Sequence, residues 1–563
     1  MSLQTSPDAG SSRALEKVTA AHKREELRAG VRDCRSRGLY QAAKWASEQL
    51  AGLPAIDHTE KQSTFRGQGA REEDSDALLL ARTLFDAKEY RRAAAVLKNV
   101  SGNASLFLRL YSLYLAGERR KEDERKELAG PLGRADVRNG QLDELEMTLH
   151  EECTKMQETM HPDGFLFYLY GCVLADRERK DEARKILLEA CSAYPCNWSA
   201  WQALQSLSAP DAQSGIPLPQ HWMRDFFLAS LCLDLQHNEE ALGRLQKLQQ
   251  AFPESDWVMN QAATAQYNLR NFDEAQALFE ELRRRDPDRL EGMDTYSNIL
   301  YVKEQYVELS HLAHRAANSE KYRPETCCII GNYYSLRGHH EKAVTYFRRA
   351  LKLNPQYLSA WTLMGHEYVE MKSPPAAIEA YRRAVDLNPR DYRAWYGLGQ
   401  TYELLNMPNY ALYYFRRATQ LRPSDARMWC AMGQCHEHEQ LGQLEAAIRC
   451  YHRAVDHNDR EGIAVHKLAK LYKQLADTER AAHFYMLHLK RLDEEQSQGQ
   501  DVAEALEFLA TYNKDIGVYD EAEALTARLM DFGGPYRDAA KSLMREIRTA
   551  RYAKSGMTGM LGL

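Results

Sequence analysis

The stretch PQYLSAWTLMGHEYVEMKSPPAAIEAYRRAVDLNP (Pro355–Pro389) decides the fold, because proline stands at both of its ends, 34 positions apart. The same step taken in both directions meets proline at five of six positions, which are Pro253, Pro287, Lys321, Pro355, Pro389 and Pro423. The chain has only 18 prolines in 563 residues, so this phasing is not chance. A fixed period of this length predicts stacked copies of one small structural unit.

Two further positions keep the same phase. The position 24 residues before each proline is small, and it reads Ala229, Ala263, Ser297, Gly331, Gly365 and Gly399. The position eight residues before is mostly bulky, and it reads Leu245, Phe279, Ala313, Phe347, Tyr381 and Phe415. Small residues allow two antiparallel helices, A and B, to approach closely, while proline ends helix B. This is the tetratricopeptide pattern.

The repeats extend in both directions and leave no room for a separate catalytic domain. The sequence therefore predicts an all-α tetratricopeptide-repeat solenoid, a superhelix of about a dozen helix pairs. We expect degenerate repeats and loops in residues 1–220, a regular superhelix with a peptide-binding groove in 221–535, and a capping helix with a flexible tail in 536–563. The capping helix is expected at about Tyr536–Arg551, and loops at Gly52–Ser75, Glu118–Asn139 and Ser208–Pro219.

The composition excludes several classes of protein. A net charge of -6 gives no electrostatic reason to expect nucleic-acid binding. The longest apolar run, Phe226–Leu235, is too short to cross a bilayer, and the polar start of the chain shows no secretory signal. The 11 cysteines form no CxxC pair, which favours buried thiols in a reducing compartment. We therefore expect a soluble intracellular protein that contacts no membrane.

Enzyme and metal motifs are missing. The sequence contains no GxxxxGK[ST], no HExxH and no credible strand before a glycine-rich loop. His436 and His438 alternate with glutamates, but residues two apart on a helix point to different sides, so we interpret them as surface residues. We predict no catalytic residues, no cofactor and no metal, and hence no enzyme.

The A helices suggest a binding groove instead. Position 9 of successive repeats is polar, and it reads Asn298, Asn332, His366, Gln400 and Gln434, while position 5 adds Tyr396. Side-chain amides can bond a peptide backbone in both directions, although the alternative is a row that is merely solvated. Glu367, at position 10, is expected at the groove edge, where it could grip an arginine together with Asn332. We expect neither residue to lie at a repeat packing position.

Several stretches also resemble one particular family. MDTYSNILYV (Met293–Val302), KYRPETCCIIGNYYSLR (Lys321–Arg337) and RDYRAWYGLGQTYELL (Arg390–Leu405) are similar to the cell division cycle protein 23 family, the eighth subunit of the anaphase-promoting complex, an E3 ubiquitin ligase. The resemblance spans about Val31 to Leu529. The first thirty residues, the insertion Glu439–Gly442 and the tail Ala553–Leu563 depart from it.

The resemblance implies a non-catalytic scaffold subunit that acts in mitotic ubiquitination, in the nucleus and the cytoplasm. It implies a homodimer formed through the N-terminal repeats and contacts with other repeat and scaffold subunits. It also implies that the C-terminal repeats bind the activator's C box, an Asp-Arg-Tyr-Ile-Pro-like segment. The family's contacts to that arginine fall on Asn332 in GNYY and Glu367 in GHEY.

Two other functions stay open from the residues alone. One is a tetratricopeptide adaptor or co-chaperone that binds extended peptides outside the ubiquitin system. Arg393 and Arg427 stand at position 2, but the lysines with which such co-chaperones clamp a C-terminal carboxylate are missing. The other is an enzyme whose repeats serve a catalytic domain, against which the lack of any leftover domain argues.

Overall fold

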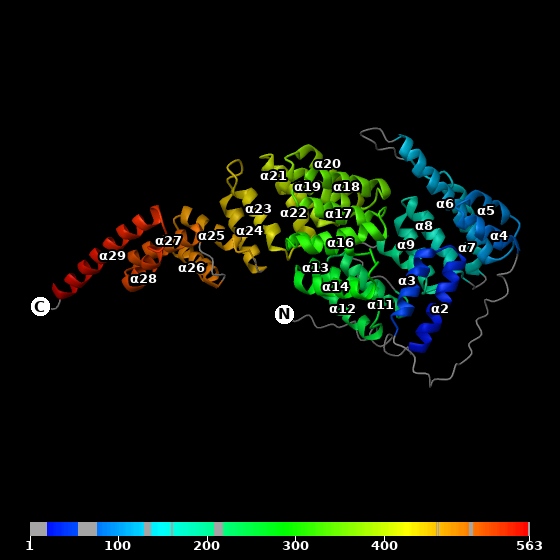
Figure 1. Cartoon of the computed structure of the whole chain (residues 1–563), viewed down its shortest axis with the longest axis horizontal. Helices are drawn as coiled ribbons and strands as arrows, with labels where there is room; N and C mark the ends of the chain where they lie inside the picture. The colour runs from blue at the N-terminus through cyan, green and yellow to red at the C-terminus, as the bar shows by residue number, and fades with distance from the viewer. Residues whose placement is uncertain are drawn as a thin grey trace. The chain divides into compact units, whose positions relative to one another are not determined.

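The computed structural model describes residues 20–53, 76–128, 137–158, 162–207, 218–457, 459, 461–494 and 499–560, and every regular element among them is a helix. The predicted all-α class is confirmed (Figure 1). The chain divides into two compact units, unit 1 up to Val302 and unit 2 from Lys303. The boundary predicted at residue 220 separates degenerate from regular repeats, whereas these units are groups of residues in contact. The boundary at residue 220 therefore stays a prediction.

The helices of unit 1 are α2 (Ala20–Ser36), α3 (Tyr40–Ala51), α4 (Asp76–Asp86), α5 (Tyr90–Val96), α6 (Asn103–Leu128), α7 (Leu142–Glu158), α8 (Gly164–Asp176), α9 (Lys180–Ala193), α10 (Trp198–Leu207), α11 (Met223–Asp234), α12 (Asn238–Ala251), α13 (Asp256–Asn268), α14 (Phe272–Arg285) and α15 (Met293–Val302).

The helices of unit 2 are α16 (Tyr306–Ser319), α17 (Pro324–Leu336), α18 (His340–Leu353), α19 (Leu358–Glu370), α20 (Pro374–Leu387), α21 (Tyr392–Leu404), α22 (Pro408–Leu421), α23 (Ala426–Glu437), α24 (Leu444–Asp456), α25 (Ile463–Gln474), α26 (Thr478–Glu494), α27 (Gln500–Ile516), α28 (Tyr519–Leu529) and α29 (Pro535–Met560). From α17 to α28, odd-numbered helices are the A helices and even-numbered ones the B helices.

The small residues on the A helices pack as the sequence predicts. A Cβ atom added to Gly365 would lie 2.5 Å from the ring of Tyr381, and one added to Gly331 would lie 2.4 Å from the ring of Phe347. Both rings are completely buried. Close approach of helix A to the bulky residue of helix B therefore requires glycine at these positions.

The turn from helix A to helix B uses a left-handed residue. These residues also recur every 34 positions, with φ between 53° and 73°, and they are Gln236, Arg270, Glu304, Gly338, Lys372 and Asn406. After α19, the N–H of Ser373 donates to the carbonyl of Tyr368 at 2.8 Å, which satisfies a carbonyl at the helix end. Only some repeats place glycine or asparagine here, so turn composition alone does not reveal the period.

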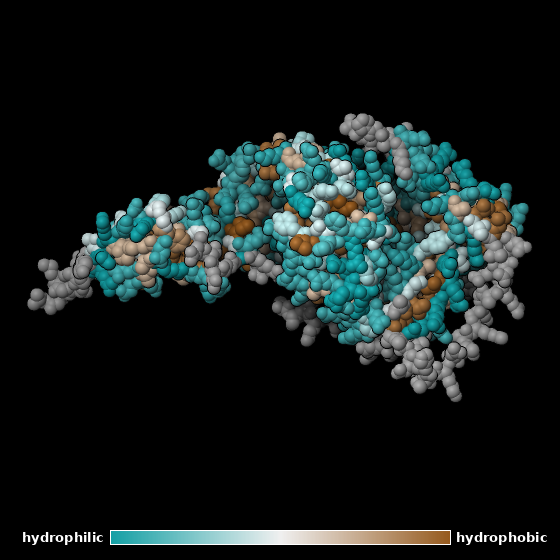
Figure 2. Space-filling view, in the orientation of Figure 1, coloured by the Kyte–Doolittle hydropathy of each residue, from teal (hydrophilic) through white to brown (hydrophobic). Residues whose placement is uncertain are grey.

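Recurring polar contacts join one repeat to the next in unit 2. The indole N–H of Trp361 donates to the carbonyl of Pro355 at 3.0 Å, and Trp395 donates to Pro389 at 2.9 Å. The proline that ends a B helix thus also anchors the following A helix. The face of the molecule visible in Figure 2 is mostly hydrophilic, with hydrophobic residues in small patches. No helix among the described residues has both the length and the apolar character needed to cross a membrane.

The first helix pair of unit 1 does not pack only on its sequence neighbours. Trp45 of α3 stacks on Trp198 of α10 with ring centroids 4.5 Å apart, and Gln49 accepts a 2.6 Å hydrogen bond from Ser255, 206 residues away. The indole of Trp222 donates to Glu26 of α2 at 2.7 Å. The helices α2 and α3 therefore pack against residues of later repeats in unit 1, which a stack of sequence neighbours does not predict.

Two boundary predictions were wrong. Residues 118–128 are not a loop but the last turns of α6, because Arg120 pairs with Glu124 at 2.6 Å and Lys121 with Glu118 at 3.2 Å, spacings that stabilise a helix. The terminal helix α29 continues to Met560 instead of ending near Arg551. Residues 54–75, 129–136 and 208–217 of the predicted loops lie outside the described residues.

Candidate functional site

A buried carboxylate lies between two adjacent A helices of unit 2. Glu367 of α19 is only 5% exposed. One of its oxygens accepts a 2.6 Å hydrogen bond from the hydroxyl of Ser335 on α17, and the other lies 2.8 Å from Nδ1 of His340, the first residue of α18. The carboxylate is therefore held in one orientation by the preceding repeat.

The expectation that Glu367 lies at the groove edge, away from packing positions, was wrong. Stepping by 34 places Glu367 in line with Ile299, Tyr333, Thr401 and Cys435, and three of these four are buried. Asn332 is also buried, with 3% of its surface exposed. It precedes Ser335 by three residues on α17, so its side chain lies within one helical turn of the group that holds Glu367.

His366 lies in a different environment from its neighbour Glu367. Its side chain is exposed, and its Nδ1 lies 2.7 Å from the hydroxyl of the buried Tyr381 on α20. Desolvation by the surrounding protein, with a smaller contribution from the charge of Arg393, lowers the pKa of His366 to about 4. His366 is therefore neutral at physiological pH.

The other predicted groove residues are dispersed. Tyr396 of α21 is half-buried against Phe415, with ring centroids 5.4 Å apart, and burial raises its pKa to about 12. Gln400 of α21 is exposed. Asn298 is half-buried on α15, which belongs to unit 1. Within unit 2, the predicted site residue Glu367 is joined to Ser335 and His340, two residues that were not predicted as part of the site.

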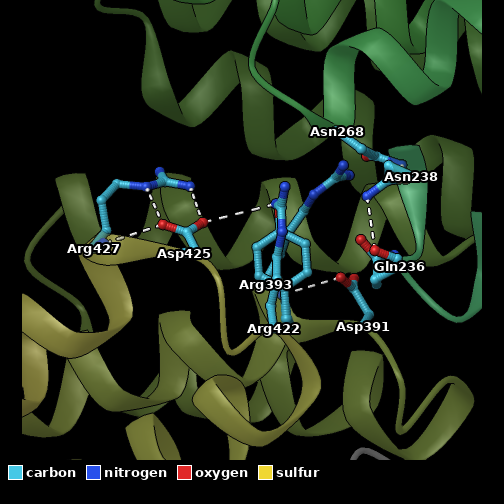
Figure 3. A network of polar contacts seen from close by, with 9 residues as sticks. Gln236, Asn238, Asn268, Asp391, Arg393, Arg422, Asp425 and Arg427 are labelled. Carbon is cyan, nitrogen blue, oxygen red and sulfur yellow. Dashed lines mark hydrogen bonds and ion pairs between the residues drawn. The ribbon is translucent and has the colours of Figure 1, made fainter. Parts of the chain in front are cut away.

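Arg393 and Arg427, which stand at position 2 of their repeats, belong to a polar network at the start of α21 and α23 (Figure 3). Asp425 caps α23 by accepting the N–H of Arg427, whose guanidinium also binds its carboxylate at 2.9 and 3.2 Å. Arg422 donates to the hydroxyl of Tyr392 at 2.7 Å and lies 3.8 Å from Asp425. The signal in the sequence is the spacing Asp-x-Arg, which occurs at Asp391–Arg393 and again 34 residues later.

This network explains why Arg427 is a poor clamp for a free carboxylate. Burial would raise the pKa of Asp425, but hydrogen bonds and charge from Arg427 and Arg422 hold the pKa below its usual value. The same arginines, with Arg393, also lower the pKa of the buried Tyr392 although desolvation alone would raise it. The guanidinium of Arg427 is already paired with Asp425, the residue that caps α23.

Among the described residues, His436 and His438 belong to no group of side chains that could hold a metal. The described residues contain two such groups, and they are Glu26 with Cys196 and His221, and His466 with Asp501 and Glu504. His436, expected on the surface, is buried and lies 3.1 Å from the side chain of Gln443. Ten of the 11 cysteines are buried, as predicted, and all are free thiols.

Comparisons with known proteins agree with this architecture. The family model described as Anaphase promoting complex subunit 8 / Cdc23 matches residues 22–263, and tetratricopeptide-repeat models match 260–293, 324–357 and 362–426. The chain is 52% identical to Anaphase-promoting complex subunit 8 of Arabidopsis thaliana, over 94% of this chain and 96% of that protein. It is 45% identical to Anaphase-promoting complex subunit 8 of Dictyostelium discoideum, over 93% and 97%.

A solved structure shares the fold. The crystal structure of the APC/C hetero-tetramer Cut9-Hcn1 contains a chain that superimposes with a TM-score of 0.56, covering 96% of this chain and 99% of that one. The sequence identity is only 15%, so this match supports the tetratricopeptide-repeat solenoid alone.

Proposed function

Because the chain belongs to the anaphase-promoting complex subunit 8 / Cdc23 family, we propose that it acts as a non-catalytic scaffold subunit of that ubiquitin ligase. In this proposal it binds neighbouring tetratricopeptide-repeat and scaffold subunits, forms a homodimer, and is found in the nucleus and the cytoplasm. Its second role is to bind the activator's C box, an extended Asp-Arg-Tyr-Ile-Pro-like segment, through the A helices of unit 2.

The observation that carries the C-box proposal is the positioned carboxylate of Glu367. Its two hydrogen bonds come from a hydroxyl and an imidazole, and a carboxylate offers about four lone-pair sites, so acceptor capacity for a guanidinium remains. Asn332 lies within a turn and supplies an amide. At 5% exposure, the carboxylate needs a small side-chain opening before an arginine reaches it.

The neighbouring position 9 residues suit the rest of an extended peptide. If the hydroxyl of Tyr381 donates to Nδ1 of the neutral His366, the Nε2–H of His366 can donate to a peptide carbonyl. The exposed amide of Gln400 lies one repeat further along the chain. A carboxylate for arginine beside polar groups for the backbone favours this ligand over one recognised by its C-terminal carboxylate.

Fluorescence anisotropy with a labelled C-box-like peptide tests this proposal. Glu367→Gln keeps the side chain's size and its ability to bond Ser335 but removes the charge. We expect roughly ten- to a hundredfold weaker binding, since hydrogen bonds to charged groups contribute about 1.5–3 kcal/mol. Asn332→Ala should weaken binding too. Glu370→Gln, at the exposed end of the same helix, is the matched control and should bind normally.

A second peptide, with arginine replaced by alanine, closes a double-mutant cycle. The wild-type protein and Glu367→Gln should bind this peptide equally weakly, because the interaction is already absent. If Glu367→Gln binds the arginine peptide as tightly as the wild type, the arginine site is wrong. If the wild-type protein does not bind the peptide at all, the alternative function, a tetratricopeptide adaptor for other ligands, is favoured over C-box binding.

The homodimer proposal rests on the degenerate repeats of unit 1 and on family membership. Apolar side chains on α4 and α7 are exposed there, with Leu80 at 52% and Met147 at 64%. A fragment ending near residue 240 would remove Ser255, the partner of Gln49, so the full chain is the right material. Light scattering at micromolar concentration should give twice the chain mass of 64.6 kDa, and a monomer mass would contradict the proposal.

The non-catalytic proposal has its own test. The purified chain, mixed with a ubiquitin-charged conjugating enzyme, should not accelerate ubiquitin discharge. The cysteines fit this expectation, because desolvation raises the pKa of Cys430 and Cys435 to about 12, so neither is a ready nucleophile. Discharge that depends on a cysteine of this chain would contradict the proposal.

A further inference from the structure

The A helices α25 and α27 carry a cluster that the functions proposed above do not use. His466 lies on α25, and Asp501 and Glu504 lie in the first turns of α27. One ligand atom from each of the three residues lies within 4.8 Å of the others, and Nε2 of His466 is 4.0 Å from Asp501. Asp501 and Glu504 are three residues apart, so they share one face of the helix.

The nitrogen of His466 that faces away from the carboxylates contacts a second histidine. This nitrogen, Nδ1, lies 3.0 Å from Nε2 of His488, a buried residue of α26. When Nδ1–H of His466 donates to His488, Nε2 of His466 keeps its lone pair on the side of the carboxylates. Histidines that bind metals usually donate their other N–H to an acceptor in this way.

We propose that His466, Asp501 and Glu504 bind a zinc ion that links the A helices of two successive repeats. One imidazole and two carboxylates are ligands that zinc accepts, whereas calcium and magnesium prefer oxygen alone. Three protein ligands leave a fourth tetrahedral position for water. Bonds of about 2.0–2.1 Å require ligand atoms about 3.4 Å apart, so the pair at 4.0 Å needs only small side-chain rotations.

The cluster also contains a competitor. One oxygen of Glu504 accepts a 3.2 Å hydrogen bond from the hydroxyl of Tyr485, and its other oxygen lies 3.2 Å from the ammonium group of Lys470. The Lys470 side chain is 39% exposed, so it can turn into solvent when zinc replaces it. Lys470 therefore competes with zinc for Glu504, and removal of this lysine should strengthen zinc binding.

The other possible metal group fits zinc less well. Glu26 already accepts the indole N–H of Trp222 at 2.7 Å. Cys196 is buried, and desolvation raises the pKa of its thiol, which opposes formation of the thiolate that binds metal. We therefore assign the site to α25 and α27.

Zinc titration of the reduced full-length chain, with a chromophoric chelator as competitor, tests the assignment. Asp501→Asn changes an exposed side chain without altering its shape and should weaken this site at least roughly tenfold. Lys470→Gln should tighten it. Asp515→Asn, equally exposed on the same helix, is the matched control and should leave zinc binding unchanged.

Hydrogen exchange locates the bound ion. Zinc should slow exchange in α25 and α27 of the wild type and of Asp515→Asn, but not of Asp501→Asn. The assignment fails if Asp501→Asn binds zinc as tightly as the wild type. It also fails if Lys470→Gln leaves the affinity unchanged, because the measured zinc would then sit elsewhere on the chain.

Discussion

Replacing Gly365 with alanine tests the packing rule on which the whole array rests. The ring of Tyr381 is fully buried between two glycines, and a Cβ at Gly365 or at Gly397 would lie 2.5 Å from it. The hydroxyl of Tyr381 is also tied to His366 at 2.7 Å, so the ring has little freedom to retreat. Gly365→Ala must therefore shift the ring, the helix or both.

The expected magnitude is a balance of two opposing effects. Overpacking a well-filled core costs about 1–3 kcal/mol. Alanine in place of glycine inside a helix returns about 1 kcal/mol. Since the obstructing group is a buried ring wall rather than a flexible chain end, the overpacking cost should lie in the upper half of that range, about 2–3 kcal/mol, which leaves a net destabilisation of about 1–2 kcal/mol.

Hydrogen exchange measured by mass spectrometry is the suitable assay, because a repeat array need not unfold in one step. Exchange in α19, α20 and α21 should become roughly five- to thirtyfold faster, the factor that corresponds to about 1–2 kcal/mol. Gly243→Ala is the matched control. Gly243 lies inside α12 with no atom within 4 Å of an added Cβ, so this change should slow exchange in α12.

The opposite signs of the two glycine substitutions make the test strict. If Gly365→Ala slows exchange as Gly243→Ala does, the close approach of helix A to Tyr381 does not control stability. A double-mutant cycle adds a second check. In a Tyr381→Leu background, which removes the ring, Gly365→Ala should cost less than it does in the wild type.

Three further predictions follow from single contacts. Lys372 has a φ of 54°, so Lys372→Gly should stabilise the protein by up to about 1 kcal/mol. Hydrogen exchange in α19 and α20 should then become slower, and faster exchange would mean that the turn is not strained. Trp395→Phe should cost about 1 kcal/mol in urea unfolding, because it removes the 2.9 Å bond to Pro389. The pKa of His366 in the folded chain, about 4, lies below its ordinary 6.5, so the unfolded chain binds the proton first. Its contribution is complete above pH 6.5 and is lost as the pH falls toward 4, and His366→Gln should show a shallower loss of stability between pH 7 and 5.

The repeat itself could be predicted because its constraints are local. The small residue on helix A and the bulky residue on helix B are 16 positions apart, as in Gly365 and Tyr381, and the same pairing recurs in each copy. A contact that every repeat makes leaves a periodic pattern in the sequence. The helix pairs of unit 2 and their fully buried aromatic rings could therefore be predicted.

Contacts made only once leave no period. Nothing in the local sequence around Trp45 or Gln49 indicates partners at Trp198 and Ser255, because these contacts join segments more than 150 residues apart. The charged end of α6 was missed for a different reason. Its acids and bases suggested a loop by composition, while their three- and four-residue spacing, which pairs Arg120 with Glu124, is helical.

The position of Glu367 gives the strongest physical argument about function. Its equivalents one and two repeats away are Ile299, Tyr333, Thr401 and Cys435, so the repeat fold at this position does not require a charge. Burying a carboxylate is costly unless hydrogen bonds compensate it, and here the chain supplies two, from Ser335 and His340. An uncharged residue would avoid this cost, so stability does not explain the glutamate. A positioned carboxylate that still has acceptor sites supports the proposed arginine ligand, because the guanidinium is planar and always charged.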